Sequence, residues 1–242
     1  WHRRRCQGDV RLPRYGPGMD DMPVTIARWS GPRGEVVLRR HGVADDAIEE
    51  LIVNGAFAMD SAETASEQAL ADLVPPGARV LVGGLGLGFT AATLLDARVG
   101  TVDVVEIEEA LVAWAYEGVT LRLGRVARDP RVRLWVADVR AVLTGHEPEP
   151  AGPWDAILLD VDNGPDFLIH AENAALYREE ALSAAYARLA PGGLLAIWCQ
   201  GANAGLRSRL QALTSTAREE VHKVRSGRHL ISYVIYTARA PH

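Results

Sequence analysis

The chain has too few cysteines for a disulfide framework. It has two in 242 residues, Cys6 and Cys199, and neither sits at a metal-ligand spacing. This usage fits the reducing cytosol. No apolar run reaches the length of a membrane span, and Arg3-Arg4-Arg5 lacks the apolar stretch that a secretory signal needs. We therefore expect a cytoplasmic protein with no metal site and no membrane partner.

An excess of positive charge is also missing. The formal net charge is −5, which argues against nucleic acid as a partner. The seven histidines have no metal-like spacing, and no G-x-S-x-G nucleophile motif occurs. With 48% apolar and 24% charged residues, the composition is ordinary for one large globular domain. The expected partner is a small-molecule substrate, and a homodimer is the assembly left open.

The stretch from Val80 to Thr90 carries the strongest signal in what is present. Apolar residues run into four glycines, Gly83, Gly84, Gly86 and Gly88, and an alanine-rich segment, 91–97, follows. This pattern predicts a buried strand, a tight turn and a helix N-terminus. Glycine lets a ligand approach the backbone, and the open amides of the helix suit a polar or anionic group. Gly84, Gly86 and Gly88 are therefore candidate cofactor-binding residues.

An acid stands at the end of the next expected strand. Residues 101–106 end on Glu106, which is the position where a carboxylate can accept hydrogen bonds from both ribose hydroxyls of a nucleoside. The alternative is a purely structural strand–helix–strand turn with a solvated Glu106.

From Arg79 onward the pattern alternates strands and helices. Strict alternation predicts a doubly wound, mostly parallel α/β sheet with helices on both faces. We expect strands at 79–83, 101–106, 131–136, 154–160 and 193–199, and helices at 88–97, 108–118, 138–144, 172–190 and 204–217. The motif Ala190-Pro191-Gly192-Gly193 predicts a sharp helix stop. A final hairpin, 219–225 with 229–238, brings the sheet to seven strands and makes one late strand antiparallel.

Three segments are expected along the chain: a basic arm at 1–21, a small β element with a helix at 22–76, and the α/β domain at 77–242. The β element contains strands at 24–29 and 35–40, and a hairpin around Asn54-Gly55, a pair that favours a type I′ turn. Its helix, 63–73, would present Ala65, Ala69 and Leu73 on one face.

Further candidate residues follow the third and fourth strands of the large sheet. Asp138-Val139 could meet an adenine, the acid accepting from the exocyclic amine, although Asp138 suits a helix N-cap equally well. Asp160 ends an apolar strand, where a carboxylate could orient an amine or take its proton. The alternative for Asp160 is a capping or turn residue. Candidates for the acceptor side are Asp162, Asn163, His170, Tyr177 and Gln200, each with an equally good surface or packing explanation.

From about residue 36 to 200 the sequence resembles the spermidine synthase-like proteins of the class I S-adenosylmethionine-dependent transferases. The segments that carry the resemblance are Asn54-Gly55, 80–86, 105–107, 129–132, 137–139, 154–160, 176–177 and 189–193. The resemblance implies a class I methyltransferase-like Rossmann fold. It also implies that Glu106 holds the ribose, Asp138 the adenine, and that Asp160 is the catalytic acid beside the acceptor amine. The implied cofactor is S-adenosylmethionine or its decarboxylated form.

The sequence departs from that family on the polyamine side. Aminopropyltransferases carry Gly-Gly-Gly-Asp-Gly-Gly, and here Leu87 stands in place of the Asp. Their Tyr-His-Glu triplet is Ala65-Ser66-Glu67, and Ala58 replaces an upstream Gln. An unpaired buried ammonium is costly, so losing these partners disfavours a diamine substrate. We therefore favour methyl transfer to a small molecule over aminopropyl transfer, and expect Leu87 to make one pocket wall apolar.

Two other functions remain open from the sequence. The segment 86–91 satisfies the dinucleotide pattern G-x-G-x-x-A, which is found in nicotinamide enzymes. Against it, Asp138 and Asp160 suit a single nucleoside. A non-catalytic nucleoside-binding module that has lost its substrate groups is the second alternative.

Overall fold

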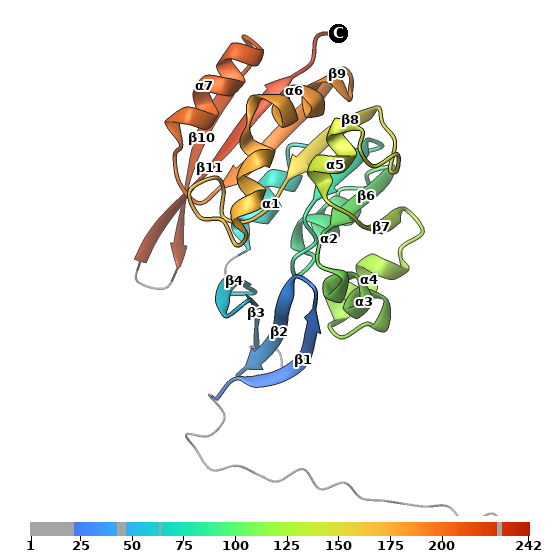
Figure 1. Cartoon of the computed structure of the whole chain (residues 1–242), viewed down its shortest axis with the longest axis vertical. Helices are drawn as coiled ribbons and strands as arrows, with labels where there is room; N and C mark the ends of the chain where they lie inside the picture. Colours follow the sequence, from blue (N-terminus) through green and yellow to red (C-terminus); the bar gives the residue numbers. More distant parts are fainter. Residues whose placement is uncertain (1–21, 43–46, 63, 227–228) are drawn as a thin grey trace, which may run out of the picture.

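The computed structural model describes residues 22–42, 47–62, 64–226 and 229–242. The predicted basic arm, 1–21, lies outside the described residues. The chain forms two sheets (Figure 1). The smaller sheet, drawn in blue and cyan, is antiparallel in the order β1-β2-β3-β4 and leads into a short helix. Its elements are β1 (Val24–Gly31), β2 (Gly34–His41), β3 (Ile48–Val53), β4 (Ala56–Asp60) and α1 (Ala65–Ala71).

The larger sheet has seven strands in the order β10-β11-β9-β8-β5-β6-β7. Strand β11 runs antiparallel to both β9 and β10, and all other neighbouring pairs are parallel, so the predicted class of sheet and its late antiparallel strand are confirmed. The strands are β5 (Arg79–Gly83), β6 (Thr101–Glu106), β7 (Val132–Val136), β8 (Trp154–Leu159), β9 (Leu189–Cys199), β10 (Arg218–Ser226) and β11 (His229–Arg239). The order reverses between β5 and β8, which is where such sheets bind ligands.

Helices cover both faces of the large sheet. They are α2 (Phe89–Asp96), α3 (Glu109–Glu117), α4 (Leu121–Arg128), α5 (Val139–Thr144), the 3₁₀ helix η2 (Ala171–Tyr177), α6 (Glu179–Ala187) and α7 (Ala204–Leu213). Successive strand residues point to opposite faces. Val80 and Val82 therefore join a core with α1 to α4, whereas Leu81 joins a second core with α5 to α7. Val36 and Leu51 of the small sheet lie in the first core, so the two sheets share it.

Three expectations about helices were wrong. Helix α4 was not foreseen; it begins at the N-cap Thr120, whose side chain accepts a hydrogen bond from the backbone of Leu123. The helix expected at 172–190 is two helices, because Arg178 is extended (φ −84°, ψ 162°). The motif Ala190–Gly193 lies inside β9 and pairs with the C-terminal segment, where Ala240 N–H donates to Gly193.

The N-terminal side contains the predicted turn and helix. The Asn54-Gly55 turn is as predicted, with φ of 52° and 77°. In α1 the buried residues are Ser66, Glu67, Leu70 and Ala71, and Ala69 and Leu73 of the predicted face are partly buried against the first core. An acid, Glu67, is therefore among the buried residues of α1.

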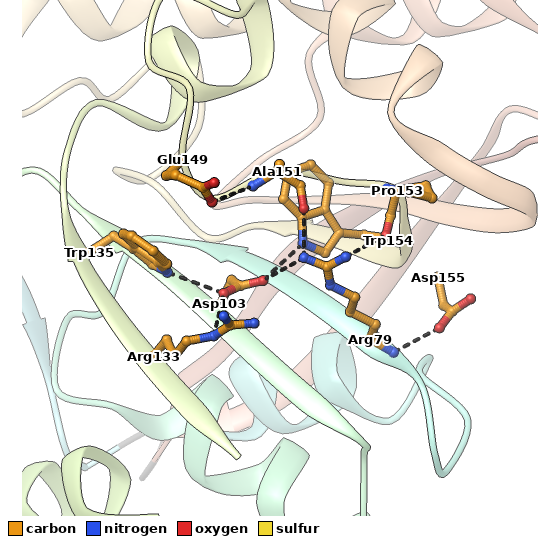
Figure 2. Close-up of polar contacts among 9 residues, drawn as sticks. All are labelled: Arg79, Asp103, Arg133, Trp135, Glu149, Ala151, Pro153, Trp154 and Asp155. Carbon is orange, nitrogen blue, oxygen red and sulfur yellow. Dashed lines mark hydrogen bonds and ion pairs between the residues drawn. The ribbon is translucent and has the colours of Figure 1, made fainter. Parts of the chain in front are cut away.

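A buried carboxylate ties four strands together near the amino ends of β5 and β8 (Figure 2). Asp103, in the middle of β6, is 0% exposed. Its Oδ1 lies 3.2 Å from the indole nitrogen of Trp135 and 3.3 Å from Nε of Arg133. Its Oδ2 lies 3.2 Å from the indole nitrogen of Trp154 and 3.4 Å from Arg79. The sequence pattern did not single out Asp103, because it lies in the middle of a predicted strand, where nothing distinguishes it from an ordinary strand residue.

Candidate functional site

A cavity of about 230 Å³ lies at the carboxyl ends of β5, β6 and β8. Its lining comes from five parts of the chain: the glycine turn after β5, residues 106–108 after β6, 137–140 before α5, 160–163 with 169–173 after β8, and Arg33, Met59 and Glu67 from the N-terminal side. Segments that are far apart in the sequence therefore converge on one cavity, as the sheet topology requires.

Two of the three candidate glycines face this cavity. Gly84 has φ +94°, and a Cβ there would lie 2.3 Å from the carbonyl oxygen of Asp160, so only glycine lets the turn pack on the end of β8. Gly86 has φ +51° and lines the cavity opposite Met59. Gly88 is not in the lining; it begins α2, and a Cβ there would meet Leu123 of α4. Gly88 therefore serves the packing of α2 against α4.

Leu87 does not form a wall of the cavity, contrary to expectation. It is 0% exposed and packs in the first core. The turn position that faces the cavity is Gly86. The sulfur of Met59 lies against its backbone, 2.6 Å from the position that a Cβ would occupy. This wall is still apolar, but Met59 makes it so, and no pattern in the sequence indicates that contact.

Glu106 holds the glycine turn as well as facing the cavity. Its Oε2 accepts from the backbone N–H of Leu85 at 2.7 Å, and its Oε1 accepts from that of Glu108 at 2.8 Å. The side chain is 6% exposed, and burial raises its pKa against the opposing effect of these hydrogen bonds. Each carboxylate oxygen can accept more than one hydrogen bond, so a ligand hydroxyl can still bind.

The variant Glu106→Ala should weaken nucleoside binding by about 2–3 kcal/mol, because two charge-assisted hydrogen bonds to a ribose are lost. Isothermal titration with S-adenosylmethionine measures the loss. Glu109→Ala is the matched control, since Glu109 carries the same charge, is exposed and lies outside the cavity. Unchanged affinity in Glu106→Ala would remove Glu106 from the ribose site.

Asp138 and Val139 line the cavity, and Asp138 also caps α5. Its Oδ1 accepts from the backbone N–H of Arg140 at 2.8 Å. The helix-cap explanation for Asp138 is therefore confirmed, and the residue also lines the cavity. Val139 packs against Gly83 and forms part of the cavity floor.

Asp160 lines the cavity just after the end of β8 and is half-buried. The hydroxyl of Thr90 donates to its Oδ2 at 2.6 Å. Burial, reinforced by the nearby carboxylate of Glu67, raises the pKa of Asp160 to about 7, although the Thr90 hydrogen bond opposes the shift. A carboxyl group with this pKa can both accept and hold a proton near neutral pH.

Of the five candidates for the acceptor side, three line the cavity and two do not. Asp162, Asn163 and His170 line the cavity, whereas Tyr177 and Gln200 do not. Tyr177 is 2% exposed, and its hydroxyl donates to the carbonyl of Val161 at 2.6 Å, so it supports the loop after β8.

Asp162 mainly organises its own loop. It has a positive φ of 54°, its Oδ1 accepts from the backbone of Ile169, and its Oδ2 accepts from the side chain of Asn173. Burial raises the pKa of Asp162. Each oxygen of its carboxylate therefore accepts one hydrogen bond from within the loop, and the residue lines the cavity.

Among the cavity residues that sequence reasoning missed are an acid, a thioether and a guanidinium from the N-terminal side. Glu67 approaches from α1, Met59 from β4 and Arg33 from the β1–β2 turn. Nε of Arg33 contacts Glu108 at 3.1 Å, and His170 contacts the same oxygen at 3.3 Å. Glu67 falls at the third position of the Ala65-Ser66-Glu67 triplet, and that match was the one available signal.

Among the described residues, no group of histidine, cysteine, aspartate or glutamate side chains could hold a metal ion. Within the same ranges, no helix is long and apolar enough to cross a membrane. Cys199 is buried, and burial raises the pKa of its thiol to about 12, so it is not poised as a nucleophile.

No protein-family model matches the sequence, and no curated protein matches it either. Similarity appears among solved structures. Spermidine synthase from Thermotoga maritima superposes with a TM-score of 0.65 at 16% identity, covering 88% of this chain and 72% of that one. A spermidine synthase in complex with the transition-state analogue AdoDATO superposes with a TM-score of 0.65 at 15% sequence identity. The match covers 88% of this chain and 73% of that one. TrmN from Thermus thermophilus superposes with a TM-score of 0.50 at 24% sequence identity. The match covers 70% of this chain and 47% of that one. At these identities the likeness establishes the fold: this chain has the Rossmann-like fold shared by spermidine synthase and the class I methyltransferases.

Proposed function

We propose that this protein transfers a methyl group from S-adenosylmethionine to a small amine. The observation that carries the proposal is the convergence of Glu106, the glycine turn and Asp160 on one cavity at the switch point of the sheet. Glu106 would bind the ribose, Asp138 and Val139 the adenine, and Asp160 the acceptor. The fold likeness to spermidine synthase and TrmN supports a transferase that uses a nucleoside of this type.

The chemistry needs little from the protein beyond alignment and a proton acceptor. A sulfonium methyl group is already activated, so holding a nucleophile in line with the C–S bond supplies most of the rate. The amine lone pair forms the new C–N bond, and the C–S electron pair stays on sulfur. The amine proton passes to the Asp160 carboxylate. Glu67 and Asp160 together make this end of the cavity acidic, which suits a cationic acceptor.

Methyl transfer is favoured by the wall at Gly86. A nucleoside whose tail ends in a lone ammonium needs a carboxylate beside it. At this wall, the described residues that line the cavity are Gly86 and Met59, and neither carries a carboxylate. We therefore expect tighter binding of S-adenosylmethionine than of its decarboxylated form.

Placing an acid at this wall should alter that preference. The double variant Gly86→Asp with Met59→Ala adds a carboxylate and removes the sulfur that would collide with it; Asp tolerates the left-handed backbone there. The wild-type preference of about 1–3 kcal/mol should narrow or reverse. Dissociation constants for both nucleosides measure the change, with Met59→Ala alone as the control for lost packing. Tighter wild-type binding of the decarboxylated form would overturn methyl transfer.

Aminopropyl transfer from decarboxylated S-adenosylmethionine is the second candidate, favoured by one observation. Glu67 and Asp160 stand close enough for the charge of one to raise the pKa of the other, and such a pair could also receive the lone ammonium of the decarboxylated tail. Mass spectrometry of an amine acceptor distinguishes the two reactions by the mass of the group gained.

One titration series separates the remaining alternatives. Calorimetry with S-adenosylmethionine, its decarboxylated form, methylthioadenosine and NAD identifies the nucleoside. Preference for NAD would favour the nicotinamide alternative suggested by segment 86–91. Nucleoside binding without turnover of any amine would favour a non-catalytic module.

A further inference from the structure

Thr90 makes a contact that neither its helix nor its packing requires. It is the second residue of α2 and is 4% exposed. A buried hydroxyl costs free energy unless it is hydrogen-bonded, and a valine would fill the same space without that cost. The N-cap of α2 is Gly88, which has no side-chain cap, so Thr90 is not a capping residue.

The hydroxyl of Thr90 instead reaches across to another element. Oγ1 donates to Oδ2 of Asp160 at 2.6 Å, a short bond between α2 and the end of β8. Thr93, one turn later, shows the ordinary alternative: its hydroxyl donates to the carbonyl of Phe89 within the same helix at 3.0 Å. Two threonines of one helix therefore make different contacts, and only that of Thr90 leads to the cavity.

The backbone around Asp160 is also held. Its N–H donates to the carbonyl of Gly83 at 2.9 Å, and its own carbonyl packs on Gly84, where a side chain would not fit. With the backbone fixed and Oδ2 taken by Thr90, the remaining freedom of the carboxyl group is small. Oδ1 is then the oxygen available to a bound ligand.

We propose that Thr90 is a positioning residue for Asp160: its hydroxyl holds Oδ2, so that Oδ1 meets the nucleophile and takes its proton. The inference rests on the proposed transferase function. During transfer, the nucleophile forms a bond to the carbon on sulfur, the C–S pair remains on sulfur as a neutral thioether, and the proton of the nucleophile goes to Oδ1. Because Thr90 stays hydrogen-bonded to Oδ2 throughout, the carboxyl group need not rotate.

The variant Thr90→Val keeps the shape and removes the hydroxyl. It should lower kcat about 10- to 100-fold, the loss expected for one hydrogen bond to a charged group, with the dissociation constant of S-adenosylmethionine within about twofold of wild type. The acid limb of the pH profile should move upward by about one pH unit, because the charged carboxylate has lost a donor. Thr90→Ser should retain both rate and profile. Thr93→Val is the matched control and should behave as wild type.

A second readout does not depend on turnover. Carbon-13 NMR of the side-chain carboxyl groups should show one titrating near pH 7, assigned by its disappearance in Asp160→Asn, and Thr90→Val should move that titration upward. An unmoved titration in Thr90→Val, or a Thr90→Ser variant as impaired as Thr90→Val, would overturn the role of Thr90. If no amine is turned over by the wild type, the proposed function fails, and the NMR titration alone then decides for or against Thr90.

Discussion

Asp160→Asn should lower kcat by about 10²–10⁴-fold while leaving nucleoside affinity nearly unchanged. The range is that of a lost general base, and the amide retains the shape of the side chain. Thr90 can still donate to the amide oxygen, so the local packing survives. Single-turnover kinetics and calorimetry on the same sample measure the two effects. Asp155→Asn is the control, because Asp155 lies on β8, which directly precedes Asp160, and is exposed and outside the cavity.

The pH dependence provides a second check on Asp160. The carboxylate is the active form, and its pKa is raised to about 7, so wild-type activity should fall as the pH drops below about 7. In Asp160→Asn this loss of activity at low pH should be absent.

The carboxyl group of Asp160 also affects stability. It ionises near pH 4 when the chain is unfolded and near pH 7 when it is folded, so raising the pH between these values destabilises the folded state. Asp160→Asn should thus be more stable than wild type at pH 8. Equal loss of binding and turnover would instead make Asp160 a cofactor-binding residue.

Asp103→Ala should lower the free energy of unfolding by about 3–5 kcal/mol. Removing the carboxylate leaves the buried indole N–H of Trp154, the half-buried indole N–H of Trp135 and two guanidinium groups without their shared acceptor (Figure 2). Urea denaturation followed by tryptophan fluorescence is suitable, because two of the partners are tryptophans. The cavity lies at the other ends of the strands, so the folded variant should keep its nucleoside affinity.

Asp155→Ala serves as the comparison for Asp103→Ala. Asp155 is exposed and accepts one hydrogen bond, from the backbone of Arg79 at 2.7 Å, so its loss should cost about 1 kcal/mol or less. A cost for Asp103→Ala as small as that of Asp155→Ala would show that water replaces the carboxylate, and that the cluster is not needed to hold the four strands.

Local patterns were sufficient for the parts of the fold that depend on neighbours in sequence. The apolar run into Gly83 and Gly84 defined β5 and its turn, and the Asn54-Gly55 pair defined a hairpin, because both depend on backbone preferences of adjacent residues. The same reasoning failed at 172–190, where η2 and α6 form a continuous run of helix-favouring residues and the break at Arg178 is not marked by glycine or proline.

The sequence by itself determined the parallel sheet and the places where Glu106 and Asp160 stand, because acids that follow parallel strands must meet at one edge. The tertiary structure decided which side chains complete that edge. It turned Gly86 rather than Leu87 toward the cavity, brought Met59 and Glu67 in from the N-terminal elements, and joined Thr90 to Asp160 across 70 positions of the chain. These contacts depend on the rotation of a helix or a turn about its axis, and packing against distant residues sets that rotation.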